Sequence, residues 1–363
     1  MSTSKRILIP AFIAALAVSI FAQPDPNFHI YLLFGQSNMA GGGATANPIT
    51  QDCDTNPRVK VLAFCDCNAL TSVCGNKYSG KRTKDTWYTA YPPLHICSEG
   101  VSPGDWFAKT MLDSIRSDIK IGLIPCALSG QALKVFTKGG SNFNIPTWAH
   151  PTLGNSSPYA WMLQRCKTAQ QTGVIKGILF HQGESGSGAG SWVDMAKGIF
   201  DNLKTDLGLD SKTPVIVGEL RQSSGSCCAS FNTNIQNLSK SYPNCGLASS
   251  VDLPSNGIDP YHFNSAGMRE LGKRYANAFL KLASEEFVPR KGSVNTIYSS
   301  RINYREIASE SASFNVYSMD GRIVKSGLTS KDANALRMKT QGLYIISRQQ
   351  NDSRTAIVPY INQ

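Results

Sequence analysis

Residues 23–285 show short apolar runs of strand length alternating with longer segments of helical spacing. The first run, 30–35, is unbroken and ends in Gly35 before Gln36-Ser37-Asn38, which is typical of a fully buried strand in a parallel sheet. The runs are 30–35, 59–64, 121–126, 178–180, 214–218 and 247–253, and the helical segments are 104–115, 158–171, 192–207, 230–242 and 264–282. Strands that alternate with helices of this length need crossover connections. The pattern therefore predicts an α/β fold, a parallel sheet with helices on both faces.

The pattern changes after residue 285. Residues 286–295 combine Pro, Arg, Lys and Gly and are interpreted as a linker. Beyond them, strand-like segments on both sides of Asp320-Gly321 predict a β-hairpin, and 342–346 and 356–359 predict further strands. Residues 296–363 contain no cysteine, histidine or tryptophan. We expect them to form a small antiparallel β domain without catalytic groups.

The first residues have the order of a secretory signal peptide. Lys5-Arg6 precedes a nearly continuous apolar stretch over 7–21, and the small residue Ala22 follows. We expect residues 1–22 to be removed, leaving no membrane span and a secreted or cell-surface protein. The alternative is an uncleaved membrane anchor.

The expected export affects how the ten cysteines are interpreted; five of them lie in the segment from Cys53 to Cys97. In an oxidising compartment an even number favours disulfides, although the connectivity cannot be read from the sequence. Cys65, Cys67 and Cys74 could instead be metal ligands. No repeated C-x-x-C pair or neighbouring His doublet supports zinc, so disulfides are the preferred interpretation.

The net charge of +11 is concentrated in the tail. After residue 289, 11 Lys and Arg stand against 5 Asp and Glu. No aromatic-interleaved basic run or nucleic-acid motif accompanies them. We expect no nucleic-acid partner and interpret the basic tail as a solvated face that can bind a surface.

Polar or reactive residues repeatedly follow the expected strands. Ser37 follows the first strand, and the later strands lead to Gly130, to Gln182 with Glu184, and to Asp259 with His262. Open α/β sheets bind their ligands at the carboxyl ends of their strands. An isolated Gly-x-Ser is also a common helix cap. Because polar or reactive residues follow several strands and not just one, the sequence favours a site at the carboxyl edge of the sheet.

A serine hydroxyl needs a general base, usually His, and a group that orients that His. Asp259 precedes His262 by three residues, so one turn can present both side chains to the same cleft. The other four histidines lie before the first strand, in loops, or at the end of a strand. His262 is therefore the candidate base.

Three blocks carry a resemblance to the SGNH-hydrolase superfamily: Gly35-Gln-Ser-Asn-Met39, His181-Gln-Gly-Glu184 and Asp259-x-x-His262-Phe263. The residues in these blocks resemble those of carbohydrate esterase family 6, the acetyl xylan esterases, and of the related sialate O-acetylesterase-like domains. The resemblance implies a flavodoxin-like three-layer sandwich over 23–285.

The same resemblance implies roles for the site residues. Ser37 would be the nucleophile and His262 the base, and the oxyanion hole would combine the N–H groups of Ser37 and Gly130 with the amide of Gln182. Gln182 departs from the Asn of the superfamily's third block. The triad acid is open: Asp259 is the usual superfamily choice and is favoured, and Glu184 is the alternative.

The tail resembles the carboxyl-terminal sorting domains of secreted bacterial hydrolases; a small carbohydrate-binding module is the alternative. Together these features predict a secreted serine esterase that removes O-acetyl groups from a polysaccharide, foremost acetyl xylan, without a cofactor or metal. The alternatives are an esterase for acetylated sialic acid or other small esters, and a non-catalytic carbohydrate-binding or adhesion protein.

Overall fold

The computed structural model describes residues 23–45, 48–68, 73–74, 80–140, 145, 147–185, 191–222, 228–283, 313–318, 323–329, 344–349 and 357–359. The expected signal peptide 1–22 and linker 286–295 lie outside these residues. The chain divides into two compact units, Met1–Phe287 and Val288–Gln363. Within the described residues, no helix combines the length and apolar character needed to cross a membrane.

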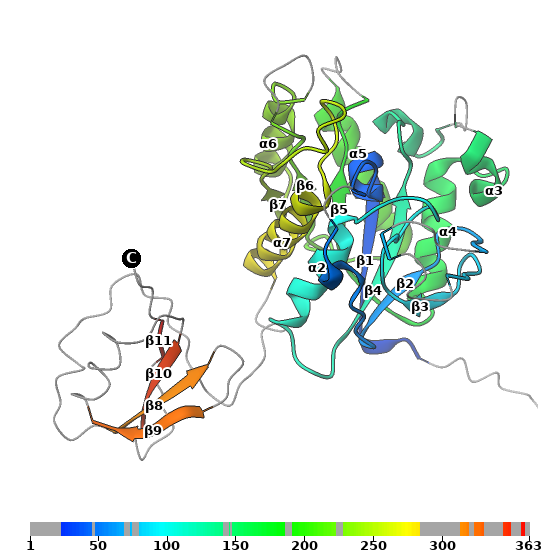
Figure 1. The fold of residues 1–363 in the computed structure, drawn as a ribbon. Coiled ribbons are helices and arrows are strands. Elements are labelled where there is room, and N and C mark those ends of the chain that lie inside the picture. The colour runs from blue at the N-terminus through cyan, green and yellow to red at the C-terminus, as the bar shows by residue number, and fades with distance from the viewer. Residues whose placement is uncertain are drawn as a thin grey trace, which may run out of the picture. The chain divides into compact units, whose positions relative to one another are not determined.

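The first unit is built on a seven-stranded mixed sheet in the order β3-β2-β4-β1-β5-β6-β7 (Figure 1). Six strands are parallel, and β3 pairs antiparallel with β2 at one edge. The strands are β1 (Asp25–Gly35), β2 (Val59–Leu62), β3 (Trp87–Thr89), β4 (Lys120–Ala127), β5 (Gly173–His181), β6 (Val215–Gly218) and β7 (Cys245–Ala248). β1 lies at the centre, between β4 and β5.

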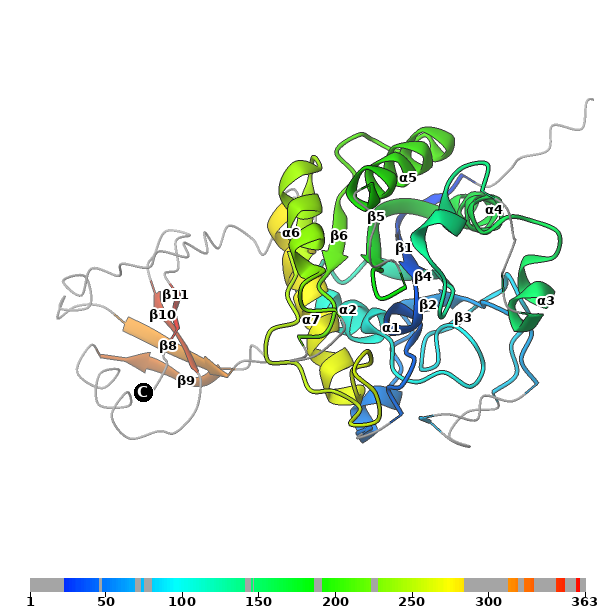
Figure 2. The same cartoon turned by 90° about the horizontal axis from the view of Figure 1, so that it is seen from above.

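Helices cover both faces of this sheet (Figure 2). Along β1, Ile30, Leu32 and Phe34 pack into one apolar core, and Tyr31 and Leu33 pack into the other. The first core lies under α4 (Pro158–Gln170), α5 (Trp192–Leu207) and α6 (Asn232–Ser241), and the second under α2 (Pro103–Leu112) and α7 (Ser265–Leu282). Alternate side chains of a strand point to opposite faces, so β1 contributes to both cores. The predicted α/β sheet with two helical layers is confirmed.

The short elements lie in the connections. They are the helices α1 (Ser37–Ala40) and α3 (His150–Leu153), and the 3-10 helices η1 (Thr50–Cys53), η3 (Leu133–Phe136) and η4 (Thr147–Ala149). The helix that leads into β4, α2, covers one face of the sheet, and the helix that leads into β5, α4, covers the other. Because β4 and β5 lie on either side of β1, the carboxyl end of β1 is a switch point of the sheet.

Two strand predictions need correction. The last strand is Cys245–Ala248, not 247–253. After Ala248 the chain leaves the sheet because Glu219 Oε2 accepts hydrogen bonds from Ser249 Oγ (2.7 Å) and Ser250 N (3.0 Å). Strand β3 has no counterpart among the expected strands; among the described residues, its three residues pair with the edge of β2 alone.

Gly35 ends β1 in a conformation that only glycine adopts readily. Its φ is +132°, and a Cβ added there would lie 1.9 Å from the backbone oxygen of His181 on β5. The neighbouring Gln36 N–H donates to that same oxygen at 3.0 Å. The absence of a side chain therefore lets the turn that carries Ser37 pack directly on the end of β5.

Gly35→Ala is expected to destabilise the protein by about 2–5 kcal/mol, since the methyl group clashes with backbone and keeps a strained φ. Thermal and urea unfolding followed by circular dichroism measure this loss. Gly154→Ala is the matched control, because Gly154 has φ +60° but open space around it. It should cost no more than about 1–2 kcal/mol. Equal losses in the two variants would contradict the role of the close approach.

The cysteine-rich segment is cross-linked. Disulfides join Cys53 to Cys74 and Cys67 to Cys97, and Cys228 is also disulfide-bonded. Cys65, Cys67 and Cys97 have sulfur atoms within 4.8 Å of one another. Two of these sulfurs are joined in a disulfide, so the three do not offer a set of thiolate ligands. The free thiols among the described residues are Cys65, Cys126, Cys166 and Cys245.

The described part of the second unit is a four-stranded antiparallel sheet in the order β11-β10-β8-β9. Its strands are β8 (Ser313–Ser318), β9 (Ile323–Leu328), β10 (Tyr344–Gln349) and β11 (Ile357–Pro359). The expected hairpin turn at Asp320-Gly321 lies outside the described residues. The role assigned to this unit stays a prediction.

Candidate active site

Ser37 is the first residue of α1, directly after the central strand β1. A run of three glycines, 41–43, follows this short helix. A Cβ on Gly42 would lie 2.9 Å from Ser37 Cβ, and a Cβ on Gly43 would lie 2.8 Å from His262 Cβ. The glycine run therefore passes close to both side chains and leaves room for them to meet.

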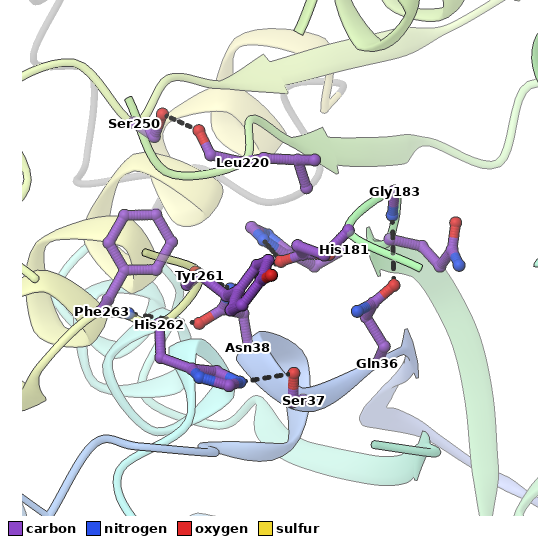
Figure 3. Close-up of polar contacts among 12 residues, drawn as sticks. Gln36, Ser37, Asn38, His181, Gly183, Leu220, Ser250, Tyr261, His262 and Phe263 are labelled. Carbon is purple, nitrogen blue, oxygen red and sulfur yellow. Dashed lines mark hydrogen bonds and ion pairs between the residues drawn. The ribbon is translucent and has the colours of Figure 1, made fainter. Parts of the chain in front are cut away.

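His262 meets Ser37 from the loop between β7 and α7. Its Nε2 lies 2.8 Å from Ser37 Oγ (Figure 3), and its Nδ1 lies 2.9 Å from Asp259 Oδ2. Asn264 caps α7 immediately after this loop by accepting a hydrogen bond from Gly267 N at 2.9 Å. The structure thus brings Ser37, His262 and Asp259 into one hydrogen-bonded chain, although Ser37 and His262 are 225 residues apart.

Asp259 is held as an ionised acceptor. Its Oδ1 accepts from the backbone N–H groups of Tyr261 (2.8 Å) and His262 (2.9 Å), and its Oδ2 accepts from Asn256 Nδ2 (2.8 Å). Partial burial acts to raise the pKa of Asp259, but these hydrogen bonds and the His262 ring hold that pKa well below its usual value. An ionised carboxylate only accepts, so Nδ1 of His262 carries a proton and Nε2 is free to accept one from Ser37.

Glu184 lies near the hydrogen-bonded series of Ser37, His262 and Asp259, but no described hydrogen bond or ion pair joins it to His262. The buried carboxylate accepts a 2.6 Å hydrogen bond from Asn38 Nδ2 and lies 3.5 Å from His181 Nε2. Burial acts to raise the pKa of Glu184, but His181 and the Asn38 amide hold it below its usual value.

Asn38 connects Glu184 to the loop of His262. Its Nδ2 also donates to Tyr261 O at 3.0 Å, and its Oδ1 accepts from Phe263 N at 3.4 Å (Figure 3). Tyr261 and Phe263 are the two neighbours of His262 in the chain. Glu184 therefore orients Asn38, and Asn38 fixes the backbone on both sides of His262.

Gly130 and Gln182 follow β4 and β5, the strands on either side of β1. Gln182 Nε2 donates to Gln131 O (3.1 Å), and its Oε1 accepts from Trp192 Nε1 (2.9 Å). These two bonds fix the amide and leave one N–H of Nε2 to bind an oxyanion. Within the described part of the chain, no hydrogen bond takes up the backbone N–H of Ser37 or Gly130. Three donors are thus available from the expected residues.

Two further polar residues belong to this region. The buried Gln36 accepts from Ser185 N (3.2 Å) and Gly183 N (3.4 Å; Figure 3), which ties the turn that carries Ser37 to the end of β5. Glu99 accepts from Ser129 Oγ at 3.0 Å beside Gly130, and burial raises its pKa. Gln36 stands inside a recognisable sequence block, so its place was accessible to sequence reasoning. No local pattern marks Glu99.

Comparison with known proteins gives a family match. A model of the family described as carbohydrate esterase, sialic acid-specific acetylesterase, matches residues 27–281. A protein of Arabidopsis thaliana named "Probable carbohydrate esterase" is 28% identical over 275 residues, which cover 71% of this chain and 92% of that protein.

Solved structures share the fold of the first unit. An Arabidopsis thaliana protein solved by X-ray crystallography aligns with a TM-score of 0.53 and 24% identity, covering 71% of this chain and 99% of that one. The crystal structure of NanS aligns with a TM-score of 0.53 and 16% identity, covering 70% and 98%. Both alignments span nearly the whole of the known protein's chain, so the shared fold corresponds to one complete domain.

Proposed function

The chain belongs to the carbohydrate esterase family described as sialic acid-specific acetylesterase, and on that premise we propose that it hydrolyses O-acetyl esters of a polysaccharide through Ser37, His262 and Asp259. Family membership makes it a carboxylic ester hydrolase for acetylated sugars. The continuous hydrogen-bonded chain from Ser37 Oγ through His262 to Asp259 carries the proposal about mechanism.

In the proposed reaction, Ser37 Oγ attacks the acetyl carbonyl while His262 Nε2 accepts the hydroxyl proton. The N–H groups of Ser37 and Gly130 and the Gln182 amide stabilise the negative charge on the carbonyl oxygen. The tetrahedral intermediate then expels the sugar oxygen, which takes the proton from His262. Water, activated by the same His, cleaves the acetyl-enzyme and releases acetate. Apart from the attacking water and the substrate, these steps use only groups of this chain.

We propose acetyl xylan as the substrate, because the residues of the three sequence blocks resemble those of acetyl xylan esterases. The description of the matching family favours a second candidate, an O-acetylated sialic acid. Both are acetylated pyranoses, so the chemistry at Ser37 is the same for each.

Acetate release by the purified full chain distinguishes these candidates. We expect kcat/KM for acetylated xylan to exceed that for O-acetyl sialic acid by about tenfold or more. The reverse order would assign the enzyme to sialic acid esters. Failure to release acetate from either sugar or from a simple acetyl ester would contradict catalysis and favour a carbohydrate-binding protein.

The proposed setting is outside the cell. The amino-terminal sequence supports export through a signal peptide, and the disulfides Cys53–Cys74 and Cys67–Cys97 suit an oxidising compartment. We further propose that the second unit serves sorting or surface attachment during secretion, on the basis of its resemblance to such domains.

A further inference from the structure

Exposed apolar side chains concentrate beside the candidate triad. Among the described residues, the exposed large hydrophobic side chains are Ile49, Val174, Val251, Ile258 and Tyr261. Two of these five lie on the short loop that carries Asp259 and His262. Ile258 is 85% exposed and Tyr261 is 43% exposed. Ligand sites in proteins are lined predominantly by apolar and aromatic side chains.

The backbone that carries these two side chains is fixed. Tyr261 N donates to Asp259 Oδ1 at 2.8 Å, and Tyr261 O accepts from Asn38 Nδ2 at 3.0 Å. Ile258 N donates to Asn256 Oδ1 at 2.9 Å. The loop therefore uses its backbone for the triad and leaves both side chains to solvent. The Tyr261 ring stands 6.4 Å from the His262 ring, centroid to centroid, at an angle of 69°.

The reaction itself locates the sugar. The departing sugar oxygen must take its proton from His262 Nε2, so it has to come within hydrogen-bond distance of that atom. Since Nε2 lies 2.8 Å from Ser37 Oγ, the acetyl group occupies the space at Ser37 and the sugar ring extends past His262. A solvent-facing side chain that adjoins His262, as Tyr261 does, is therefore within reach of that sugar.

We propose that Tyr261, with Ile258, forms a platform on which the pyranose ring that bears the acetyl group packs its C–H face. A tyrosine ring suits this contact because it presents a large, rigid apolar face to the C–H groups of the sugar. The inference rests on the proposed function and adds the recognition of the leaving sugar. It makes Tyr261 a determinant of which alcohol is accepted, separate from the chemistry on the acetyl group.

The test compares two substrates in variants of the full chain. One substrate is the acetylated sugar, xylo-oligosaccharide or sialic acid, that the wild type hydrolyses faster; the other is triacetin, an acetyl ester without a ring. For Tyr261→Ala we expect the ratio of kcat/KM values, sugar over triacetin, to fall about tenfold, mainly through KM for the sugar. Tyr261→Phe keeps the ring and should stay within about twofold of wild type.

Ile258→Ser provides a second variant that has little packing to lose, and it should lower the same ratio by about threefold. Val174→Ala is the matched control, because Val174 is also exposed but lies at the amino end of β5. An unchanged ratio in Tyr261→Ala, or an equal loss of kcat on both esters, would overturn the platform. A wild type that cleaves triacetin but neither sugar would instead refute the proposed function.

Discussion

Ser37→Ala is expected to lower kcat/KM for acetate release by at least about four orders of magnitude. Without the hydroxyl no acetyl-enzyme forms, and only binding and the oxyanion donors remain to accelerate attack by water. The folded state should persist, because the Ser37 side chain bonds only to His262 among the described contacts while its backbone carbonyl anchors Gly41 and Gly42. Acetate release and thermal melting measure the two effects separately.

The matched control is Ser156→Ala, an exposed serine in the turn before α4. It should retain wild-type turnover. A fluorophosphonate probe adds a direct readout, since it should label Ser37 in the wild type and in the control variant but leave Ser37→Ala unlabelled. Turnover of Ser37→Ala within tenfold of the wild type would remove Ser37 from the mechanism.

The sheet could be read from the sequence because its signals are local. β1, β4, β5 and β6 each contain a run of apolar residues buried on both faces, and such runs are visible in a short window. β3 could not be read this way. Its three residues become a strand only through pairing with β2, and that pairing depends on a cross-linked loop whose disulfide partners no sequence pattern specified.

The contacts of the candidate site likewise divide into those that local sequence predicts and those that depend on the fold. Asp259 and His262 lie three residues apart, so their contact follows from a single turn. The 2.8 Å approach of His262 to Ser37 depends instead on the order of strands around β1. The link from Glu184 through Asn38 to the backbone around His262 joins three distant segments. The Glu184 carboxylate is recognisable in the sequence as an alternative acid, but the sequence does not reveal that the Asn38 side chain stands between it and His262.

Asp259→Asn is expected to reduce turnover by about four orders of magnitude. An asparagine amide in this position can donate to Nδ1, which would stabilise the wrong tautomer of His262 and remove the negative charge that stabilises the imidazolium. Glu184→Gln should have a smaller effect, about tenfold to a hundredfold, since a glutamine oxygen can still accept from Asn38. Its principal loss is the pairing with His181, so its melting temperature should fall more than that of Asp259→Asn.

The double variant should be little worse than Asp259→Asn alone, because groups that act on the same His are non-additive. Turnover of all three variants is to be compared after circular dichroism has shown that each is folded. Glu270→Gln is the matched control, as Glu270 pairs with Lys273 and Arg274 on the exposed side of α7. If Glu184→Gln abolishes turnover while Asp259→Asn stays near wild type, Glu184 is the triad acid and the 2.9 Å contact between Asp259 and His262 serves only to hold the loop.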